Sequence, residues 1–124
     1  MQYKTLNDAA QLHQGLAEGS VEIWYMRPES SRTFSAGARL LKEMGNVPTY
    51  DTLGYTHVLL GSIKETDKNK ISVVMQGENW SPNGEARQLI LDKGLTHTSL
   101  MMGDIVYMNN VMYLVDFIGY SELS

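Results

Sequence analysis

The stretch that decides the fold is residues 94–120, GLTHTSLMMGDIVYMNNVMYLVDFIGY. It opens with a glycine suited to the end of a helix, continues as a polar loop and ends in two apolar runs around Asn109 and Asn110. Both asparagines tolerate positive φ, which suits the two-residue turn of a hairpin. We therefore predict a β-hairpin in which residues 104–108 pair antiparallel with residues 111–118.

Outward from this hairpin, apolar periodicity and turn residues predict the other elements. Strands are expected at 21–27, 55–65 and 71–76, and helices at 7–19, 36–44 and 82–93. The resulting order is αβα-ββ-αββ, in which short turns favour antiparallel pairing, including that of 55–65 with 71–76. Residues 1–124 are thus expected to form a single compact α+β domain, mainly an antiparallel sheet of about five strands with three short helices. Because apolar residues occur on both faces of 55–65 and 111–118, these two strands are predicted to be central.

The composition excludes several classes of function. The chain has 124 residues, no cysteine and a formal net charge of −4. Without cysteine there is no disulfide, thiol nucleophile or cysteine-ligated zinc. The ten lysines and arginines are scattered along an acidic chain, which argues against nucleic-acid binding. No run of about 18 apolar residues is present to span a bilayer, so we expect a cytosolic protein without a membrane partner.

The histidines do not form a metal or cofactor motif. There are three, and none has another histidine four residues away. We therefore predict no metal, no cofactor and no assigned catalytic residue. His97 lies beside Ser99 and shortly before Asp104, so the order of residues permits a Ser-His-Asp triad. Ser99 lacks the G-x-S-x-G context of a nucleophile elbow, which argues against a hydrolase.

Two loops supply candidate binding residues. Trp80 precedes the predicted helix at 82–93 and is expected either to pack back as a hydrophobic staple or to stand exposed as an aromatic anchor. In the second loop, Met101 and Met102 are adjacent, so in an extended stretch only one of the two can point inward. The candidate partner- or ligand-binding residues are Trp80, Asn79, His97, Ser99 and Met101.

Gly103 and Asp104 are predicted to organise the second loop. A glycine before an aspartate that opens a strand is typical of a tight turn with positive φ. The aspartate side chain then accepts hydrogen bonds from backbone N–H groups of the same loop. The alternative is that Asp104 acts directly, by orienting His97.

The segments HTSLMMGDIV at 97–106 and VDFIGY at 115–120 carry a family resemblance. They resemble the patterns H-[ST]-[ML]-S-V-G-D-[VI]-[VI] and V-D-x-x-G-[FY] of small bacteriophage and mobile-element proteins that include the YodL-like domain. The upstream segment QGENWSP at 76–82 is similar to the phage versions, and the resemblance covers about residues 71–122. The chain departs from the pattern by having Met101-Met102 where the relatives carry Ser-Val.

The resemblance implies an accessory protein of a phage or mobile element, located in the host cytoplasm, with no assigned catalytic residues. We therefore expect a non-enzymatic protein that binds a host or phage protein and modulates it. One alternative is a protein that binds or sequesters a nucleotide-type small ligand between the loops of His97 and Trp80. The other is a minor hydrolase or transferase that uses His97 as general base, oriented by Asp104 or Asp116.

Overall fold

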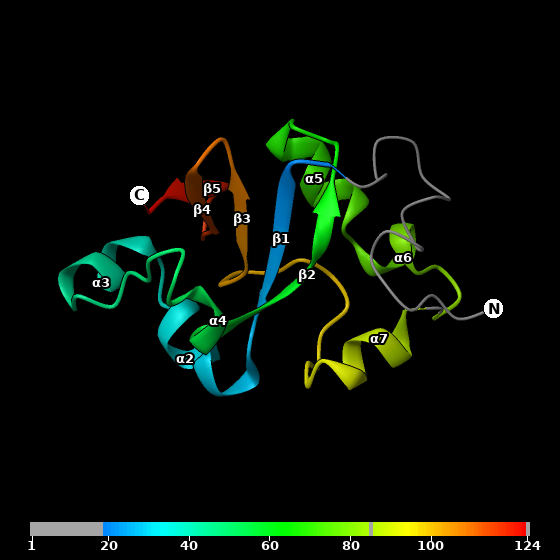
Figure 1. Cartoon of the computed structure of the whole chain (residues 1–124), viewed down its shortest axis with the longest axis horizontal. Coiled ribbons are helices and arrows are strands. Elements are labelled where there is room, and N and C mark those ends of the chain that lie inside the picture. Colours follow the sequence, from blue (N-terminus) through cyan, green and yellow to red (C-terminus); the bar gives the residue numbers. More distant parts are fainter. Residues whose placement is uncertain (1–18, 85, 124) are drawn as a thin grey trace.

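A computed structural model describes residues 19–84 and 86–123 as one α+β domain around a five-stranded antiparallel sheet (Figure 1). The strands are β1 (Val21–Met26), β2 (His57–Ile63), β3 (Ile105–Met108), β4 (Val111–Val115) and β5 (Tyr120–Glu122). Their order across the sheet is β2-β1-β3-β4-β5, and every neighbouring pair is antiparallel. The predicted fold class is confirmed.

The helices are all short and connect the strands in two groups. Between β1 and β2 lie η1 (Pro28–Ser30), α2 (Ser31–Phe34), α3 (Ala38–Glu43) and α4 (Leu53–Thr56). Between β2 and β3 lie α5 (Lys68–Val74), α6 (Gly77–Trp80) and α7 (Arg87–Asp92). The predicted order αβα-ββ-αββ is therefore wrong within the described part, and the predicted helix at 7–19 falls almost entirely outside it.

Alternation along β1 assigns the two helix groups to opposite faces of the sheet. Val21, Ile23 and Tyr25 face the larger core, which α5, α6 and α7 complete. Met26 faces a smaller core beneath α2, α3 and α4, together with apolar residues of β3 and β4. The sheet is thus covered on both faces, with β1 and β3 buried at its centre (Figure 1).

The predicted closing hairpin is confirmed and has one more strand. β3 pairs with β4 from Ile105↔Leu114 to Met108↔Val111, and Asn109 and Asn110 have φ of 52° and 62°. Positive φ at both positions is the signature of a type I′ turn, whose twist matches the strands. The predicted strand at 111–118 ends earlier, at Val115, because a turn at 116–119 leads into β5.

The segment predicted as a strand at 71–76 is mostly helical, so its pairing with 55–65 is wrong. The Asp67 side chain accepts hydrogen bonds from the backbone N–H groups of Asn69 and Lys70 and caps α5. Ile71 and Met75, four residues apart, both point into the core with 0% exposure. Consequently β2 has only β1 as a neighbour and is an edge strand, whereas β4 is interior as predicted.

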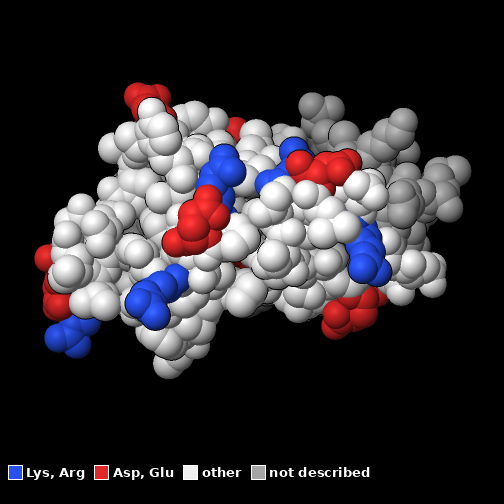
Figure 2. Space-filling view, turned by 90° about the horizontal axis from the view of Figure 1, so that it is seen from below, with Lys and Arg blue, Asp and Glu red and all other residues white. Residues whose placement is uncertain are grey.

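On the face of the molecule that Figure 2 shows, charged side chains of one sign do not gather into a single patch. Lysine and arginine side chains there are interspersed with aspartate and glutamate side chains. Within the described ranges no helix is both long enough and apolar enough to cross a bilayer.

Candidate functional site

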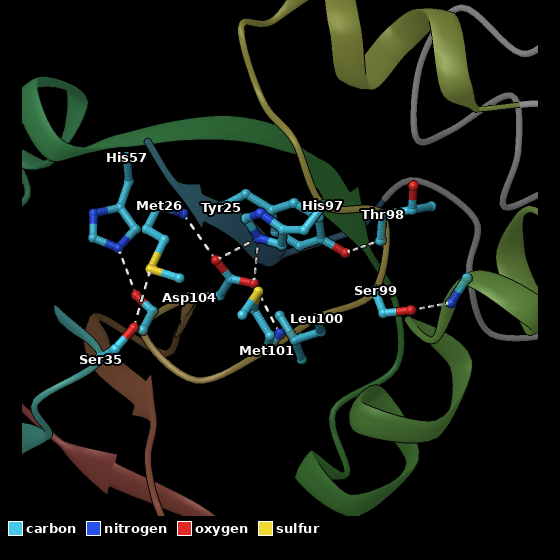
Figure 3. A network of polar contacts seen from close by, with 12 residues as sticks. Tyr25, Met26, Ser35, His57, His97, Thr98, Ser99, Leu100, Met101 and Asp104 are labelled. Carbon is cyan, nitrogen blue, oxygen red and sulfur yellow. Dashed lines mark hydrogen bonds and ion pairs between the residues drawn. The ribbon is translucent and has the colours of Figure 1, made fainter. Parts of the chain in front are cut away.

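The loop 95–104, between α7 and β3, brings together most of the polar residues that the sequence singled out (Figure 3). It runs past the end of β1 and makes hydrogen bonds to β1, β2, β4, α6 and α7. Asp104, His97 and Ser99 lie along it and point to different neighbours. We refer to residues 95–104 as the histidine loop.

Asp104 is the fixed point of the histidine loop. Its side chain is 0% exposed, and its two carboxylate oxygens accept hydrogen bonds from the backbone N–H groups of Met26 (2.8 Å) and Met101 (2.9 Å). Burial raises the pKa of Asp104, although the His97 contact and the two backbone hydrogen bonds act to lower it. The carboxylate therefore ties the loop to the end of β1, as predicted for an organising aspartate.

The same carboxylate orients His97. The ring Nε2 lies 3.0 Å and 2.9 Å from the two carboxylate oxygens, and the ring stacks on Tyr25 with centroids 4.5 Å apart and an interplanar angle of 16°. The His97 side chain is 16% exposed. Both alternatives for Asp104 thus occur in one geometry, since the carboxylate organises the backbone and also holds the imidazole.

The other residues of the histidine loop are engaged with the helices. The Thr98 carbonyl accepts hydrogen bonds from the Tyr25 hydroxyl (2.6 Å) and from the Trp80 Nε1–H group (3.0 Å). Ser99 Oγ accepts a hydrogen bond from the Gly77 backbone N–H at 2.7 Å. The loops of His97 and Trp80 are therefore in direct contact. Residues of both loops, among them Gly77, Ser81, Thr96 and Thr98, line a cavity of about 390 Å³.

His57 anchors the far end of the loop. Its Nε2 lies 2.8 Å from the Gly103 carbonyl oxygen, and its Nδ1 lies 2.8 Å from Thr56 Oγ1. Because a carbonyl only accepts, Nε2 carries the proton. Burial lowers the pKa of His57 to about 4, with smaller contributions from the nearby charges of Arg27 and His97, so the ring is neutral near pH 7.

Several predicted binding residues are placed differently from the expectation. Trp80 is 0% exposed in the main core, so its interpretation as an exposed anchor is wrong. The helix predicted at 82–93 is shorter, since α7 begins at Arg87, and Ser81 Oγ accepts a hydrogen bond from Ala86 N. The Asn79 amide donates to the Val73 carbonyl oxygen at 2.6 Å, which fixes α6 against α5. Met101 is 42% exposed and is the member of the predicted set that presents a large apolar side chain to solvent.

The histidine loop does not assemble a catalytic triad. Ser99 is turned toward Gly77 and away from the imidazole (Figure 3). Within residues 19–84 and 86–123, no hydroxyl lies within hydrogen-bond distance of His97 Nδ1, and no group of three or more histidine and acidic side chains could hold a metal ion. Asp116, the other candidate orienter, lies in the turn after β4 and contacts that turn instead of His97. The geometry favours a structural role for this network.

A second region, which the sequence did not single out, is apolar and exposed, unlike the polar and internally bonded histidine loop. The turn 116–119 presents Phe117 and Ile118 with exposed fractions of 67% and 93%. Leu40 and Met44 of the α3 segment, 44% and 66% exposed, continue the apolar surface across two shallow cavities of about 390 and 170 Å³. Leu40 lines both cavities and Phe117 lines the larger one. We call Phe117, Ile118, Leu40 and Met44 the apolar patch.

Hydrogen bonds to Asp116 fix the shape of this turn. Its carboxylate accepts from Ser121 Oγ (2.6 Å), Phe117 N (2.8 Å) and Ala38 N (3.2 Å). Partial burial acts to raise the pKa of Asp116, but these hydrogen bonds and the nearby Lys42 lower it below its usual value. Gly37 has φ of +97°, and a Cβ there would lie 2.8 Å from the Phe117 ring. The turn is therefore seated against the start of α3.

Comparison of the chain with protein-family models, with curated proteins and with solved structures finds no match. The resemblance to phage and mobile-element proteins therefore stays a prediction.

Proposed function

We propose that this chain is a non-enzymatic accessory protein of a phage or mobile element, and that it binds a host protein through the apolar patch. The observation that carries the proposal is the pair Phe117 and Ile118, exposed to 67% and 93% at the tip of a hydrogen-bonded turn. Placing two large apolar side chains in water is unfavourable by about 25 cal/mol per Å² of apolar surface. A partner that covers them recovers this free energy.

The rigidity of the turn supports the proposal. Asp116 accepts three hydrogen bonds, and its own N–H donates to the Gly119 carbonyl oxygen at 2.9 Å. A turn whose backbone is held in place before binding loses less conformational entropy on association. Aromatic residues in such positions are typical of binding hot spots.

The continuity of the surface also supports it. Leu40 and Met44 extend the apolar area from the turn along one side of α3. Contiguous apolar patches on a small domain commonly mark protein interaction sites. By contrast, Ser99 and Asp104 of the histidine loop make internal hydrogen bonds, which argues against a catalytic role for that loop.

Affinity capture tests the proposal. The wild-type chain, a Phe117→Ser/Ile118→Ser variant and a Val73→Ser/Leu91→Ser control are immobilised and exposed to a lysate of a bacterial host. The control positions are 60% and 55% exposed on α5 and α7, so they also replace two exposed apolar side chains by serine, but away from the patch. We expect a protein that is retained by the wild type and the control and lost from the patch variant.

The retained protein is then purified and titrated by calorimetry. We expect its dissociation constant to rise at least tenfold for the patch variant and less than threefold for the control. Equal retention by all three chains, or turnover of a metabolite without any retained protein, would contradict the proposal. Circular dichroism spectra of the three chains show whether each is folded.

A further inference from the structure

Three aromatic side chains and one carboxylate gather on the sheet face opposite the main core. Glu22 and Trp24 alternate along β1 with the buried Ile23, so they point to the other side of the sheet. Tyr107 of β3 lies directly across from Glu22 in the sheet register, and Tyr50 reaches this group from the loop that precedes α4. We call Glu22, Trp24, Tyr50 and Tyr107 the aromatic–acid cluster.

The carboxylate is held in place by its aromatic neighbours. Trp24 Nε1–H donates to Glu22 Oε1 at 2.9 Å, and the Tyr50 hydroxyl lies 3.1 Å from both carboxylate oxygens. The Trp24 and Tyr50 rings meet nearly at right angles, at 81° with centroids 6.1 Å apart, and Tyr50 lies 4.7 Å from Tyr107. These contacts connect three elements of the fold into one arrangement that places a charge beside aromatic rings.

Among the described residues, no cation is paired with the negative charge of this cluster. Over residues 19–84 and 86–123 the ion pairs are Arg39–Glu43 and His97–Asp104, so no lysine or arginine is paired with Glu22. Both donors to Glu22 are neutral groups. The pKa of the Tyr50 hydroxyl is raised, first by its hydrogen bond to Glu22 and in small part by the charge of Asp51, which adds a second acidic group to this surface.

The cluster is accessible to a partner. Tyr50 is 46% exposed, and Glu22, Trp24 and Tyr107 are half-buried. The ring faces of tryptophan and tyrosine attract cations through their quadrupoles, and a nearby carboxylate adds a direct charge attraction. A carboxylate also has acceptor capacity beyond the donors that Trp24 and Tyr50 supply.

We propose that the aromatic–acid cluster receives an arginine side chain of the partner protein. A guanidinium is planar, stacks on aromatic rings, donates along its edge to a carboxylate and is less strongly hydrated than an ammonium group. The inference rests on the proposed function as a protein-binding chain and adds the chemistry of the partner: a surface with an exposed arginine. It concerns a surface built from β1, β3 and the loop before α4, separate from Phe117 and Ile118.

A peptide titration followed by nuclear magnetic resonance tests the inference without the partner. The probe is N-acetyl-Gly-Arg-Gly-amide, added to ¹⁵N-labelled protein up to millimolar concentration. The chain has two tryptophans, so the Trp24 indole N–H reports on the cluster and the buried Trp80 indole serves as internal reference. We expect a saturable shift of the Trp24 signal, little change for Trp80, and at least fivefold weaker binding when lysine or neutral citrulline replaces arginine.

Two variants separate the cluster from the net charge of the protein. Glu22→Gln removes the charge and keeps an oxygen that can accept from Trp24, and we expect it to weaken binding at least fivefold. Glu122→Gln removes the same charge from β5, where Glu122 pairs with Tyr113 on the opposite face of the sheet, and we expect less than twofold change. An unchanged Trp80 signal in both variants shows that the fold is retained.

Several results would overturn the inference: no shift of Trp24, equal binding of the arginine and citrulline peptides, equal binding of the lysine peptide, or equal weakening by both variants. These outcomes are independent of the capture experiment, because the peptide titration uses neither the partner nor the apolar patch. Loss of the inference therefore leaves the proposed function standing. Failure of capture together with a positive titration would contradict the proposed function and not the binding of arginine by the cluster.

Discussion

The histidine loop and the turn 116–119 are each organised by an aspartate carboxylate, but the first is packed into the fold and the second extends into solvent. In each, an aspartate carboxylate accepts backbone N–H groups, two of them for Asp104 and two for Asp116. Asp104 is 0% exposed and draws a polar segment into the fold, whereas the turn at Asp116 carries Phe117 and Ile118 out into solvent. An aspartate that organises a loop therefore says little by itself about whether the loop is a site.

The contrast shows that the type of a residue does not decide whether its side chain is free to contact another molecule. The histidine loop has the side chains that chemistry commonly uses, yet Asp104 and Ser99 are engaged in internal hydrogen bonds and the His97 ring is stacked on Tyr25. In the turn 116–119 the carboxylate of Asp116 is used by internal hydrogen bonds, and the side chains of Phe117 and Ile118 are largely exposed. If the comparison is right, changes in the histidine loop lower stability and changes in the turn lower binding.

The largest expected effect is that of Gly103→Val. Gly103 has φ of +99°, and a Cβ there would collide with the Met26 side chain. Backbone strain and overpacking each cost about 1–3 kcal/mol, so we expect a loss of about 4 kcal/mol in the free energy of unfolding, measured by urea denaturation. This outcome would confirm that the histidine loop is built around a close approach to β1.

Gly94→Val provides the matched control. Gly94 also has positive φ, at +72°, but nothing lies within 4 Å of a Cβ at that position. Only the strain remains, so the expected loss is about 1–3 kcal/mol. Equal losses in the two variants would contradict the role assigned to the contact between Gly103 and Met26.

The backbone of the hairpin could be predicted because its signals are local. Continuous apolar runs on both sides of Asn109 and Asn110 predict the strands and the turn, and φ at both asparagines is positive. The positive φ of Gly103 follows equally from its position before an aspartate that opens a strand. Predictions of this kind need no knowledge of distant parts of the chain.

The strand predicted at 71–76 is wrong because the apolar run alone does not distinguish a strand from a helix, and the preceding N-cap residue favours a helix. Ile71 and Met75 are spaced for one face of a helix, and Asp67 precedes them as an N-cap. Because that segment is helical, β2 lost its predicted partner and became an edge strand. The position of β2 in the sheet is a tertiary property, and no local signal in residues 55–65 reports it.

The site was harder to predict than the fold. Trp80 has the composition of a binding residue but is buried, and its indole N–H is used by the Thr98 carbonyl. Phe117 and Ile118 looked like the end of a strand, although Asp116 and Gly119 are the turn residues that interrupt it. The aromatic–acid cluster joins residues from three separate segments, so only the tertiary structure shows it.

A second prediction sharpens the comparison through pH. His57 has a pKa of about 4 in the folded protein, against 6.5 in the unfolded chain. Between these values the unfolded chain binds more protons, so stability falls as pH drops from 6.5 toward 4. From pH 7 to 4.5 this contributes a loss of about 2 kcal/mol, since one pKa unit corresponds to about 1.4 kcal/mol.

The variant His57→Gln tests this contribution. The glutamine amide can donate to the Gly103 carbonyl oxygen but does not titrate. The variant should therefore lose about 2 kcal/mol less than the wild type between pH 7 and 4.5, measured by urea denaturation at each pH. Parallel pH profiles for the two proteins would show that His57 is not the neutral, buried anchor of the histidine loop.

The smallest expected effect belongs to Ile118→Ser and completes the comparison. Ile118 is 93% exposed at the tip of the turn, so its replacement removes almost no buried contact and should change the free energy of unfolding by less than about 0.5 kcal/mol. Phe117→Ser should cost somewhat more, about 1 kcal/mol, because the ring lies against Gly37. Urea denaturation at pH 7 measures both. A loss above about 2 kcal/mol for Ile118→Ser would mean that the turn contributes to the folded core, and the distinction between a structural loop and a binding turn would then fail.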